Sequence, residues 1–349
     1  SLEFLLFFFF FSILYFLLPH KFRWLLLLLA SCYFYMAFIP IYILILFFTI
    51  IVDYYAGILI ENAEIKRKKT YLLLSVFVNI GTLMIFKYYN FFIDNINESF
   101  SLLNSSISLP VLSLILPIGL SFHTFQALSY TIEVYRCNQK AERHFGIYAL
   151  YVMFYPQLVA GPIERPQNIL HQFHEKKYFS SEFLISGLRL MLWGFFKKVV
   201  IADRLSVYVN GVFDNADEYG SLNLIIAAVF FSIEIYCDFS GYSDIAIGSA
   251  KVMGFDLMTN FNRPYFSKNI KEFWSRWHIS LSTWFRDYVY IPLGGNRGSK
   301  FKKYRNVFIV FVLSGFWHGA NWTFILWGLI HAILNMLYMA FHKQRTYSI

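Results

Sequence analysis

The chain has 349 residues, of which 58% are hydrophobic, 21% aromatic and only 15% charged, whereas soluble domains contain about 25% charged residues. This composition excludes an ordinary soluble domain and predicts a polytopic membrane protein. The net charge of +9 indicates attraction to the anionic lipid of an inner leaflet, and it does not favour binding to nucleic acid.

Apolar runs recur along the chain, and a run of about 20 residues is long enough to cross a bilayer as a helix. The first run, residues 2–18, is longer than the apolar region of a secretory signal and has no A-x-A-like cleavage site after it, so we expect a first spanning helix. We therefore expect an all-α, multi-pass helix bundle. The candidate spans are residues 2–18, 22–39, 40–60, 71–93, 109–135, 147–160, 183–209, 222–253, 304–322 and 323–341.

The loops between these runs differ in charge, and the positive-inside rule uses that difference to orient the spans. Loops 66–69 and 297–305 are strongly basic, whereas loop 94–108 contains no Lys or Arg and loop 210–221 is acidic. We expect the two basic loops to lie in the cytoplasm and the other two to lie outside.

Two segments interrupt the pattern of spans. Residues 156–166, PQLVAGPIERP, follow an apolar run too short to cross, and irregular backbone at membrane depth requires protein or a water-filled cavity around it. We expect a re-entrant or interfacial loop there. Residues 236–248, YCDFSGYSDIAIG, place Asp238 and Asp244 among serines and glycines, which predicts a local break in the helix. A structural role is favoured for both carboxylates, and pairing or snorkelling is expected for Lys197 and Lys198 of the preceding span.

The most polar segment is 261–300, FNRPYFSKNIKEFWSRWHISLSTWFRDYVYIPLGGNRGSK. We expect Asn269 to cap a helix that Pro292 and the glycines after it terminate. The many ionisable side chains between these points exclude a lipid-facing span. The helix is expected to dip into the membrane or to lie on its inner face, where it would line a wet cavity.

Several ordered blocks resemble one family. Two of these blocks are WSRWHISLSTWFRDYVYIPLGGNR and SGFWHGANWTFILWG, and three more are PIGLSFHTFQALSYTIEVYR, VAGPIERP and DFSGYSDIAIG. Together they resemble the membrane-bound O-acyltransferase family and its bacterial branch of alginate O-acetylation proteins. The resemblance covers most of the chain from about residue 110 onward. It implies re-entrant helices around a central tunnel in the bacterial inner membrane. Through that tunnel an acyl group would pass from a cytoplasmic thioester to a hydroxyl.

The resemblance maps the two signature positions of the family onto His278 and His318, and it implies that His318 is the catalytic histidine. The chemistry agrees, because acyl transfer to an alcohol needs a base, donors for the oxyanion and exclusion of water. A helix-packing role is the alternative for His318, and a hydrogen bond that holds the re-entrant helix is the alternative for His278. Helical spacing predicts that His331 faces away from His318.

Other side chains near these histidines are candidates for binding substrate or donor. If the helix of His318 continues, Asn321 lies on the same face. Tryptophans beside it would exclude water, and basic residues would hold the phosphates of the donor. These candidates are Asn321, Arg276, Ser282, Trp317 and Arg286. We expect His123 in the core, His171 and His174 on the surface, and no metal site.

The expected function is O-acetylation of an extracytoplasmic polysaccharide such as alginate, another exopolysaccharide or peptidoglycan, with acetyl-CoA as donor and no bound cofactor. A periplasmic or extracellular acetyltransferase is the expected partner, besides membrane lipid. Two alternatives remain: D-alanyl transfer to teichoic acid from an acyl-carrier-protein thioester, and a transporter or flippase. Residues 1–349 are expected to form a single membrane-embedded domain. Because members of the family usually continue with further helices, we allow for a sequence that is incomplete at its C-terminus.

The loop charges make a testable prediction about topology. Cysteines introduced at Lys68 and Lys302 should resist a membrane-impermeant thiol reagent in intact cells, whereas a cysteine at Asn104 should react. Labelling of the two basic loops from outside would show that the predicted orientation is wrong. The expectation that the acyl donor comes from the cytoplasm would then be wrong as well.

Overall fold

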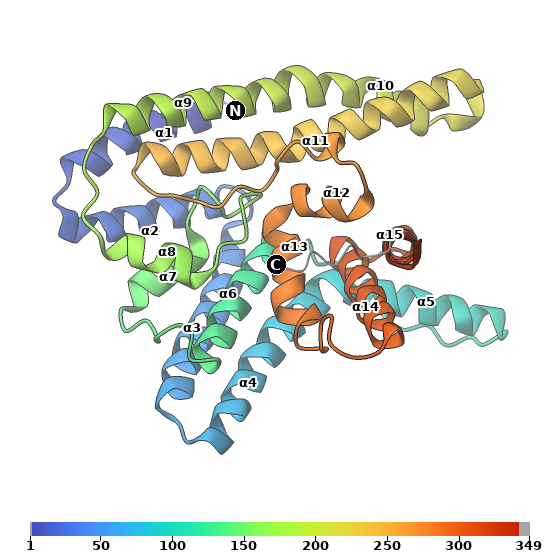
Figure 1. The fold of residues 1–349 in the computed structure, drawn as a ribbon, viewed down its shortest axis with the longest axis horizontal. Helices are drawn as coiled ribbons and strands as arrows, with labels where there is room; N and C mark the ends of the chain where they lie inside the picture. The colour runs from blue at the N-terminus through green and yellow to red at the C-terminus, as the bar shows by residue number, and fades with distance from the viewer. Residues whose placement is uncertain (1, 342–349) are drawn as a thin grey trace. The chain divides into compact units, whose positions relative to one another are not determined.

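The computed structural model describes residues 2–341, which form helices joined by loops and include no strand (Figure 1). The all-α prediction is therefore confirmed. Within these residues four helical stretches are long and apolar enough to cross a membrane. They are Pro40–Asn62, Ile65–Leu102, Ser221–Val252 and Trp322–Phe341.

The chain divides into two compact units, and each unit combines two separate stretches of sequence. The first unit comprises residues 1–43 and 142–261, and the second comprises residues 44–141 and 262–349. The single domain expected from the sequence stays a prediction.

The first unit contains the long pair of helices at the top of Figure 1, together with the N-terminal helices. Its α-helices are α1 (Leu2–Leu17), α2 (His20–Met36), α7 (Phe145–Met153), α8 (Pro166–His174), α9 (Ser181–Phe195), α10 (Asp203–Phe213) and α11 (Ser221–Val252). Its shorter elements are η1 (Pro40–Tyr42), the π-helical turn η3 (Phe196–Ala202) and η4 (Ala216–Glu218).

The second unit contains two pairs of helices and a broken polar segment. Its α-helices are α3 (Ile43–Asn62), which begins at the boundary, α4 (Ile65–Leu83), α5 (Tyr89–Leu102), α6 (Leu120–Tyr135), α12 (Ile270–Arg276), α13 (Ile279–Phe285), α14 (Lys300–His318) and α15 (Trp322–Phe341). Its shorter elements are the π-helical turns η2 (Met84–Tyr88) and η6 (Arg286–Tyr290), and η5 (Pro264–Phe266).

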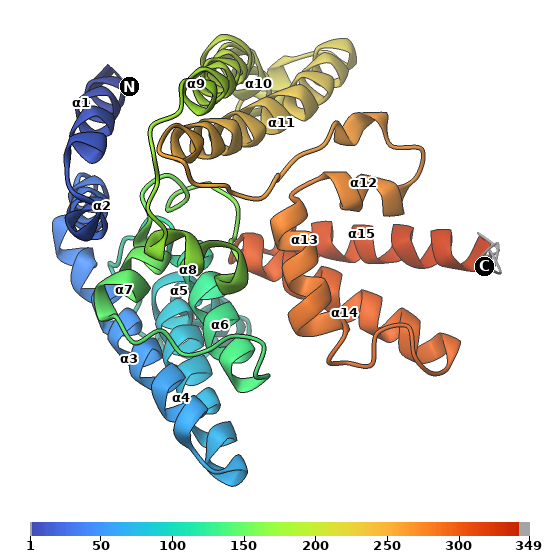
Figure 2. The ribbon, with the colours of Figure 1, turned by 60° about the vertical axis from the view of Figure 1, so that its left-hand side comes forward.

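Glycines bring α9 and α11 into direct backbone contact, and Figure 2 shows the two helices side by side. A Cβ atom at Gly187 would lie 2.7 Å from the carbonyl oxygen of Gly248, and a Cβ atom at Gly194 would lie 2.6 Å from that of Gly241. Each helix presents its two glycines two turns apart, and the order of the contacts makes the helices antiparallel. Glycines allow the backbones of two helices to approach closely. Such packing stabilises helix pairs in a membrane, where the hydrophobic effect does not favour their association.

The helix break expected within residues 236–248 is wrong, because α11 is continuous from Ser221 to Val252. Its carboxylates pair with lysines of the neighbouring helix instead of bonding their own backbone. Lys197 Nζ lies 2.7 Å from Asp244 Oδ2, and Lys198 Nζ lies 2.5 Å from Asp238 Oδ1. The pairing expected for the lysines is confirmed, and Gly241 in this stretch serves the contact with α9.

Residues 154–165 form turns and irregular backbone, as expected, although their depth in the membrane stays a prediction. The fully buried Glu164 holds this loop. Its carboxylate accepts hydrogen bonds from the backbone N–H of Met258 and from Asn168 Nδ2, both at 2.6 Å. Gln172 exchanges two hydrogen bonds with the backbone of Asp256, at 2.8 and 2.9 Å. The loop and the extended segment that follows α11 are thus fixed to each other.

The expected span at 109–135 is wrong in its first half, because residues 105–117 are not helical and α6 begins at Leu120. Pro110 and Pro117 lack the N–H that a helix interior needs. Two asparagines of α5 satisfy part of the exposed backbone. Asn90 exchanges hydrogen bonds of 2.8 and 2.9 Å with the backbone of Leu112, and Asn97 exchanges bonds of 2.9 and 2.7 Å with that of Leu109.

A buried polar cluster joins α3, α4 and α6. Asp53 is fully buried and accepts hydrogen bonds from Ser75 Oγ at 2.6 Å and from Asn79 Nδ2 at 2.8 and 2.9 Å. The Ser75 hydroxyl also lies 3.1 Å from Thr131 Oγ1 of α6. Since a buried carboxylate without partners is costly, these donors fix how the three helices pack.

The glycine contact predicts a difference between two glycine substitutions. Gly248→Ala should lower the thermal stability of the purified protein, because its Cβ would meet the Gly187 carbonyl at 2.6 Å and overpacking costs about 1–3 kcal/mol. Gly211→Ala in α10, where a Cβ meets nothing within 4 Å, should leave stability unchanged or raise it by up to about 1 kcal/mol. Equal shifts for both variants would contradict the contact.

Candidate functional site

The polar segment expected as one helix is broken at His278 into α12 and α13. The predicted cap is confirmed, because Asn269 Oδ1 accepts from the backbone N–H of Glu272 at 2.9 Å. His278 has the left-handed backbone angles φ 44° and ψ 56°, and its side chain is only 2% exposed. A non-glycine residue in this region is strained, and such strain is often found at functional sites.

His318 is the last residue of α14, so the span expected at 304–322 ends four residues early. The chain reverses through Gly319, and α15 begins at Trp322. The exposed Asn321 lies in this turn, where its Oδ1 accepts from the backbone N–H of Thr323 at 2.9 Å. The expectation that Asn321 shares a helical face with His318 is therefore wrong, because no helix connects them.

The reversal also corrects the expectation for His331. A Cβ atom at Gly315 would lie 2.3 Å from the carbonyl oxygen of Phe324 and 3.1 Å from Gly328, so α15 packs closely against α14. The Trp327 ring lies 5.0 Å from the His318 ring and 4.6 Å from the His331 ring, measured between centroids. Both imidazoles contact one tryptophan, although a single continuous helix would have separated them.

Trp317 connects the two expected histidines. Its ring centroid lies 4.9 Å from that of His318 and 6.3 Å from that of His278. Phe125 of α6 stacks on the same indole at 5.2 Å, and Phe122 contacts it edge-on at 5.6 Å. These rings enclose His278 and one side of His318 in apolar material, which limits the access of water.

Lys87 is a component of this site that the sequence analysis missed. It belongs to the π-helical turn η2, and its ammonium donates to the Trp317 carbonyl and, at 3.2 Å, to Ser121 Oγ. No carboxylate in residues 2–341 forms an ion pair with it. The next residue, Tyr88, donates its hydroxyl to the Phe316 carbonyl at 2.9 Å. The π-helical turn η2 therefore allows the consecutive side chains of Lys87 and Tyr88 both to bond carbonyl groups at the C-terminal end of α14.

The remaining candidates have local partners. Arg276 Nη2 lies 2.6 Å from Glu272 Oε1, and the hydroxyl of Ser282 donates to the Trp277 carbonyl at 3.2 Å. The exposed Arg286 pairs with Asp287 at 2.7 Å. The structure thus joins His278, Trp317 and His318 through ring contacts, whereas it gives no such contact between them and Arg276, Ser282 or Arg286.

The protonation of His278 follows from its surroundings. Burial lowers the pKa of its imidazole well below the ordinary value, and the nearby charge of His318 lowers it further. A neutral imidazole offers one hydrogen-bond donor and one acceptor.

His123, His171 and His174 lie where the sequence predicted them. His123 is buried, and the side chains of His171 and His174 are 58% and 52% exposed. No group of three or more His, Cys, Asp or Glu side chains in the described part of the chain is arranged to hold a metal ion.

Comparison with known proteins gives one family and a consistent set of relatives. Residues 13–346 match the model of the membrane-bound O-acyltransferase family. The chain is 41% identical to the "Probable alginate O-acetylase AlgI" of Pseudomonas aeruginosa, over 92% of this chain and 61% of that protein. It is 37% identical to the "Peptidoglycan O-acetyltransferase" of Helicobacter pylori, over 92% of this chain and 65% of the relative.

A more distant relative is the "Teichoic acid D-alanyltransferase" of Bacillus subtilis, which is 31% identical over 67% of this chain and 62% of its own length. The chain spans less than two thirds of each of these three relatives. The family and the apolar helices identify a multi-pass membrane protein, and the alginate relatives indicate the bacterial inner membrane.

The backbone at His278 makes a prediction that separates strain from the loss of the side chain. His278→Gly and His278→Ala both remove the imidazole, but only glycine relieves the left-handed conformation, which costs other residues about 1–2 kcal/mol. The glycine variant should therefore be the more stable of the two in thermal unfolding of the purified protein. An alanine variant of equal or higher stability would show that residue 278 is not left-handed.

Proposed function

Because the chain belongs to the membrane-bound O-acyltransferase family, we propose that it transfers an acyl group, specifically acetyl, from a cytoplasmic thioester for O-acetylation of an extracytoplasmic polysaccharide. The observation that carries this proposal is the contact of His318 with Trp317, whose carbonyl accepts a hydrogen bond from the ammonium of Lys87. A base, a nearby positive charge and an apolar enclosure are what acyl transfer to a hydroxyl requires.

His318 is the proposed general base. Its imidazole would take the proton of the attacking hydroxyl as the oxygen bonds to the thioester carbonyl carbon. The carbonyl oxygen then gains negative charge, and the ammonium of Lys87, which donates to the carbonyl of Trp317 beside His318, would stabilise that charge. Such stabilisation is strong where water is excluded. When the thiolate leaves, the proton held by His318 is available to it.

His278 is the proposed positioning residue. Its buried imidazole contacts Trp317 and Phe122 at 6.3 Å between ring centroids, so it would orient the donor carbonyl or the acceptor from the side opposite His318. Trp317 separates the two histidines and would keep water from the thioester, which hydrolysis would otherwise consume. Asn321 is a weaker candidate for contact with substrate, since its side chain caps α15.

Acetyl-CoA is the proposed donor. Lys268, Lys271, Arg276 and Arg286 belong to the polar segment that is expected on the cytoplasmic side, and basic groups hold phosphates through charge-assisted hydrogen bonds. Ion pairs with Glu272 and Asp287 already occupy the two arginines, so Lys268 and Lys271, which form no ion pair within residues 2–341, should contribute more of the binding. Affinity for acetyl-CoA should fall as salt is raised.

The names of the relatives favour acetyl transfer over D-alanyl transfer. Proteins named for O-acetylation match 92% of the chain at 37–41% identity, whereas the teichoic acid D-alanyltransferase matches 67% at 31%. D-alanyl transfer from a carrier protein remains the second candidate on the basis of that match. The family match leaves the transporter hypothesis without support. A periplasmic or extracellular acetyltransferase that completes the transfer is the proposed partner.

The base is tested by His318→Gln, which keeps a hydrogen-bonding side chain that accepts no proton at neutral pH. We expect acetyl transfer from acetyl-CoA to fall by about 10² to 10⁴ in the purified, reconstituted protein, with donor binding retained. His318→Ala should behave similarly. Asn321→Ala should cost less activity and some stability, because it removes a helix cap worth about 1 kcal/mol.

A matched control is His174→Gln, which changes an exposed histidine of the first unit and should leave transfer unchanged. A folded His318→Gln protein with most of its activity would refute the base assignment, and His278 would then be tested next. A protein that ignores acetyl-CoA but cleaves the thioester of an acylated carrier protein would favour the D-alanyl alternative.

A further inference from the structure

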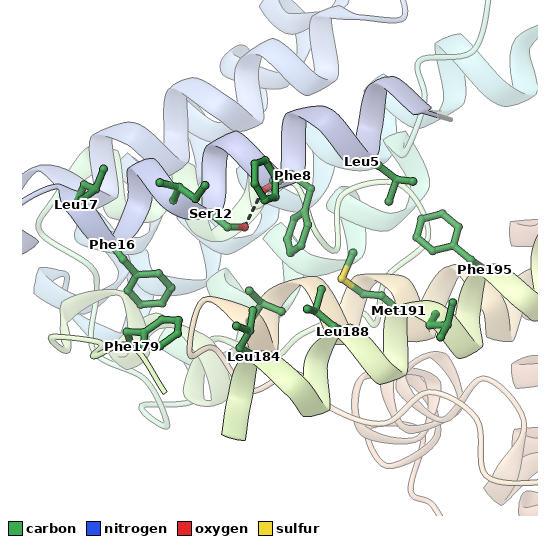
Figure 3. A pocket seen from close by; sticks show the side chains of 14 residues that line it. Leu5, Phe8, Ser12, Phe16, Leu17, Phe179, Leu184, Leu188, Met191 and Phe195 are labelled. Atoms are coloured by element: carbon green, nitrogen blue, oxygen red, sulfur yellow. Dashed lines mark hydrogen bonds between the residues drawn. The ribbon is translucent and has the colours of Figure 1, made fainter. Parts of the chain in front are cut away.

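An apolar groove runs between α1 and α9 in the first unit (Figure 3). Its volume is about 800 Å³, and Ser12 is its only polar lining residue. The Ser12 hydroxyl donates to the Phe8 carbonyl at 2.7 Å, so it offers no free donor to a ligand. The groove therefore suits a hydrocarbon chain.

The length of the groove corresponds to one leaflet of a bilayer. Figure 3 shows Leu5 and Phe195 at one end and Leu17 and Phe179 at the other. At 1.5 Å per residue the stretch of α1 from Leu5 to Leu17 extends about 18 Å. Half of the hydrocarbon core of a bilayer is about 15 Å thick, so one acyl chain of a lipid fits along the groove.

Basic residues gather beyond the Leu17 end. At this end Arg23 links α1 to the segment that precedes α9. Its guanidinium donates to the carbonyl oxygens of Phe16 and Lys177 at 3.2 and 2.5 Å. The exposed Lys21 and Lys176 flank this link in sequence and form no ion pair with any residue in the range 2–341. Their ammonium groups lie 4.9 Å from the ring centroids of Phe22 and Tyr178, contacts that leave both positive charges to attract a lipid phosphate near the Leu17 end of the groove.

The loop that follows α10 is acidic, in contrast to the basic residues near Leu17. The helix that starts with α9 continues through α10 to the acidic residues Asp214, Asp217 and Glu218. By the positive-inside rule the end with Lys21 and Lys176 faces the cytoplasm, where the leaflet contains anionic lipid. The charge of this end and the lipid of that leaflet are complementary.

We propose that the groove between α1 and α9 binds one acyl chain of an anionic phospholipid of the inner leaflet, with its phosphate held by Lys21 and Lys176. The apolar lining supplies affinity for the chain, whereas the two lysines supply selectivity for the headgroup. Such a lipid would add to the direct packing of α1 on α9, where Phe8 and Met191 share a buried cluster and the rings of Phe4 and Phe195 lie 6.3 Å apart.

The test is native mass spectrometry of the detergent-purified protein with dioleoyl-phosphatidylglycerol or dioleoyl-phosphatidylcholine, which have identical chains. The wild-type protein should retain the anionic lipid preferentially. The double variant Lys21→Gln, Lys176→Gln should lose about thirtyfold in affinity for phosphatidylglycerol and little for phosphatidylcholine. The control Lys66→Gln, Lys68→Gln removes the same charge from another basic loop and should change neither.

A second pair of variants tests the groove itself. Leu188→Trp, which fills the groove, should reduce retention of both lipids, whereas Leu73→Trp on the exposed face of α4 should not. Equal retention of the two lipids, unaffected by either lysine change, would overturn the headgroup site. Unchanged retention in Leu188→Trp would overturn the groove as the lipid site, and a dimer lost only in that variant would identify a second copy of the chain as its occupant.

Discussion

Every polar group inside a bilayer needs a partner within the protein, because lipid supplies none. The irregular segments of this fold have such partners. Two asparagines of α5 bind the non-helical backbone around Leu109 and Leu112, and Glu164 binds that of Met258. Two lysines of η3 form ion pairs with two aspartates of α11. Irregular segments occur where side chains of neighbouring helices complete their hydrogen bonds.

The candidate site is assembled from such interruptions. Lys87 lies in a π-helical turn, His278 lies at a break between two short helices, and His318 lies at the last residue of α14. Each of these points departs from the regular α-helix, and each presents a side chain in a direction that a regular helix would not give it. Trp317 then links the three by ring and carbonyl contacts. The catalytic proposal depends on these local departures more than on the long spans.

Composition and hydropathy predicted the helical class, the four stretches of residues 2–341 that are able to cross a membrane and the cap at Asn269, because these depend on local sequence. Local patterns also misled. Ser, Asp and Gly between Asp238 and Asp244 indicated a break, yet the partners of these residues come from another helix, which sequence periodicity does not reveal. The relation of His318 to Asn321 and His331 was wrong for a related reason, since helical angles were counted across a turn at Gly319. Lys87 was detectable as a lone cation in an apolar run.

The π-helical turn η2 has a consequence for how this region tolerates change. A π turn accommodates one extra residue within a helix that otherwise keeps its direction. Each residue advances an α-helix by about 100°, so the faces of α4 and α5 are out of phase across residues 84–88. Loss of a single residue there would restore a regular helix and preserve the crossing of the membrane. The loss of that residue would also rotate one of the two helices relative to the other. Either Asn90 and Asn97 of α5 would turn away from Leu112 and Leu109, or the polar residues of α4 would turn away from Asp53. Length in this segment is consequently as constrained as residue identity.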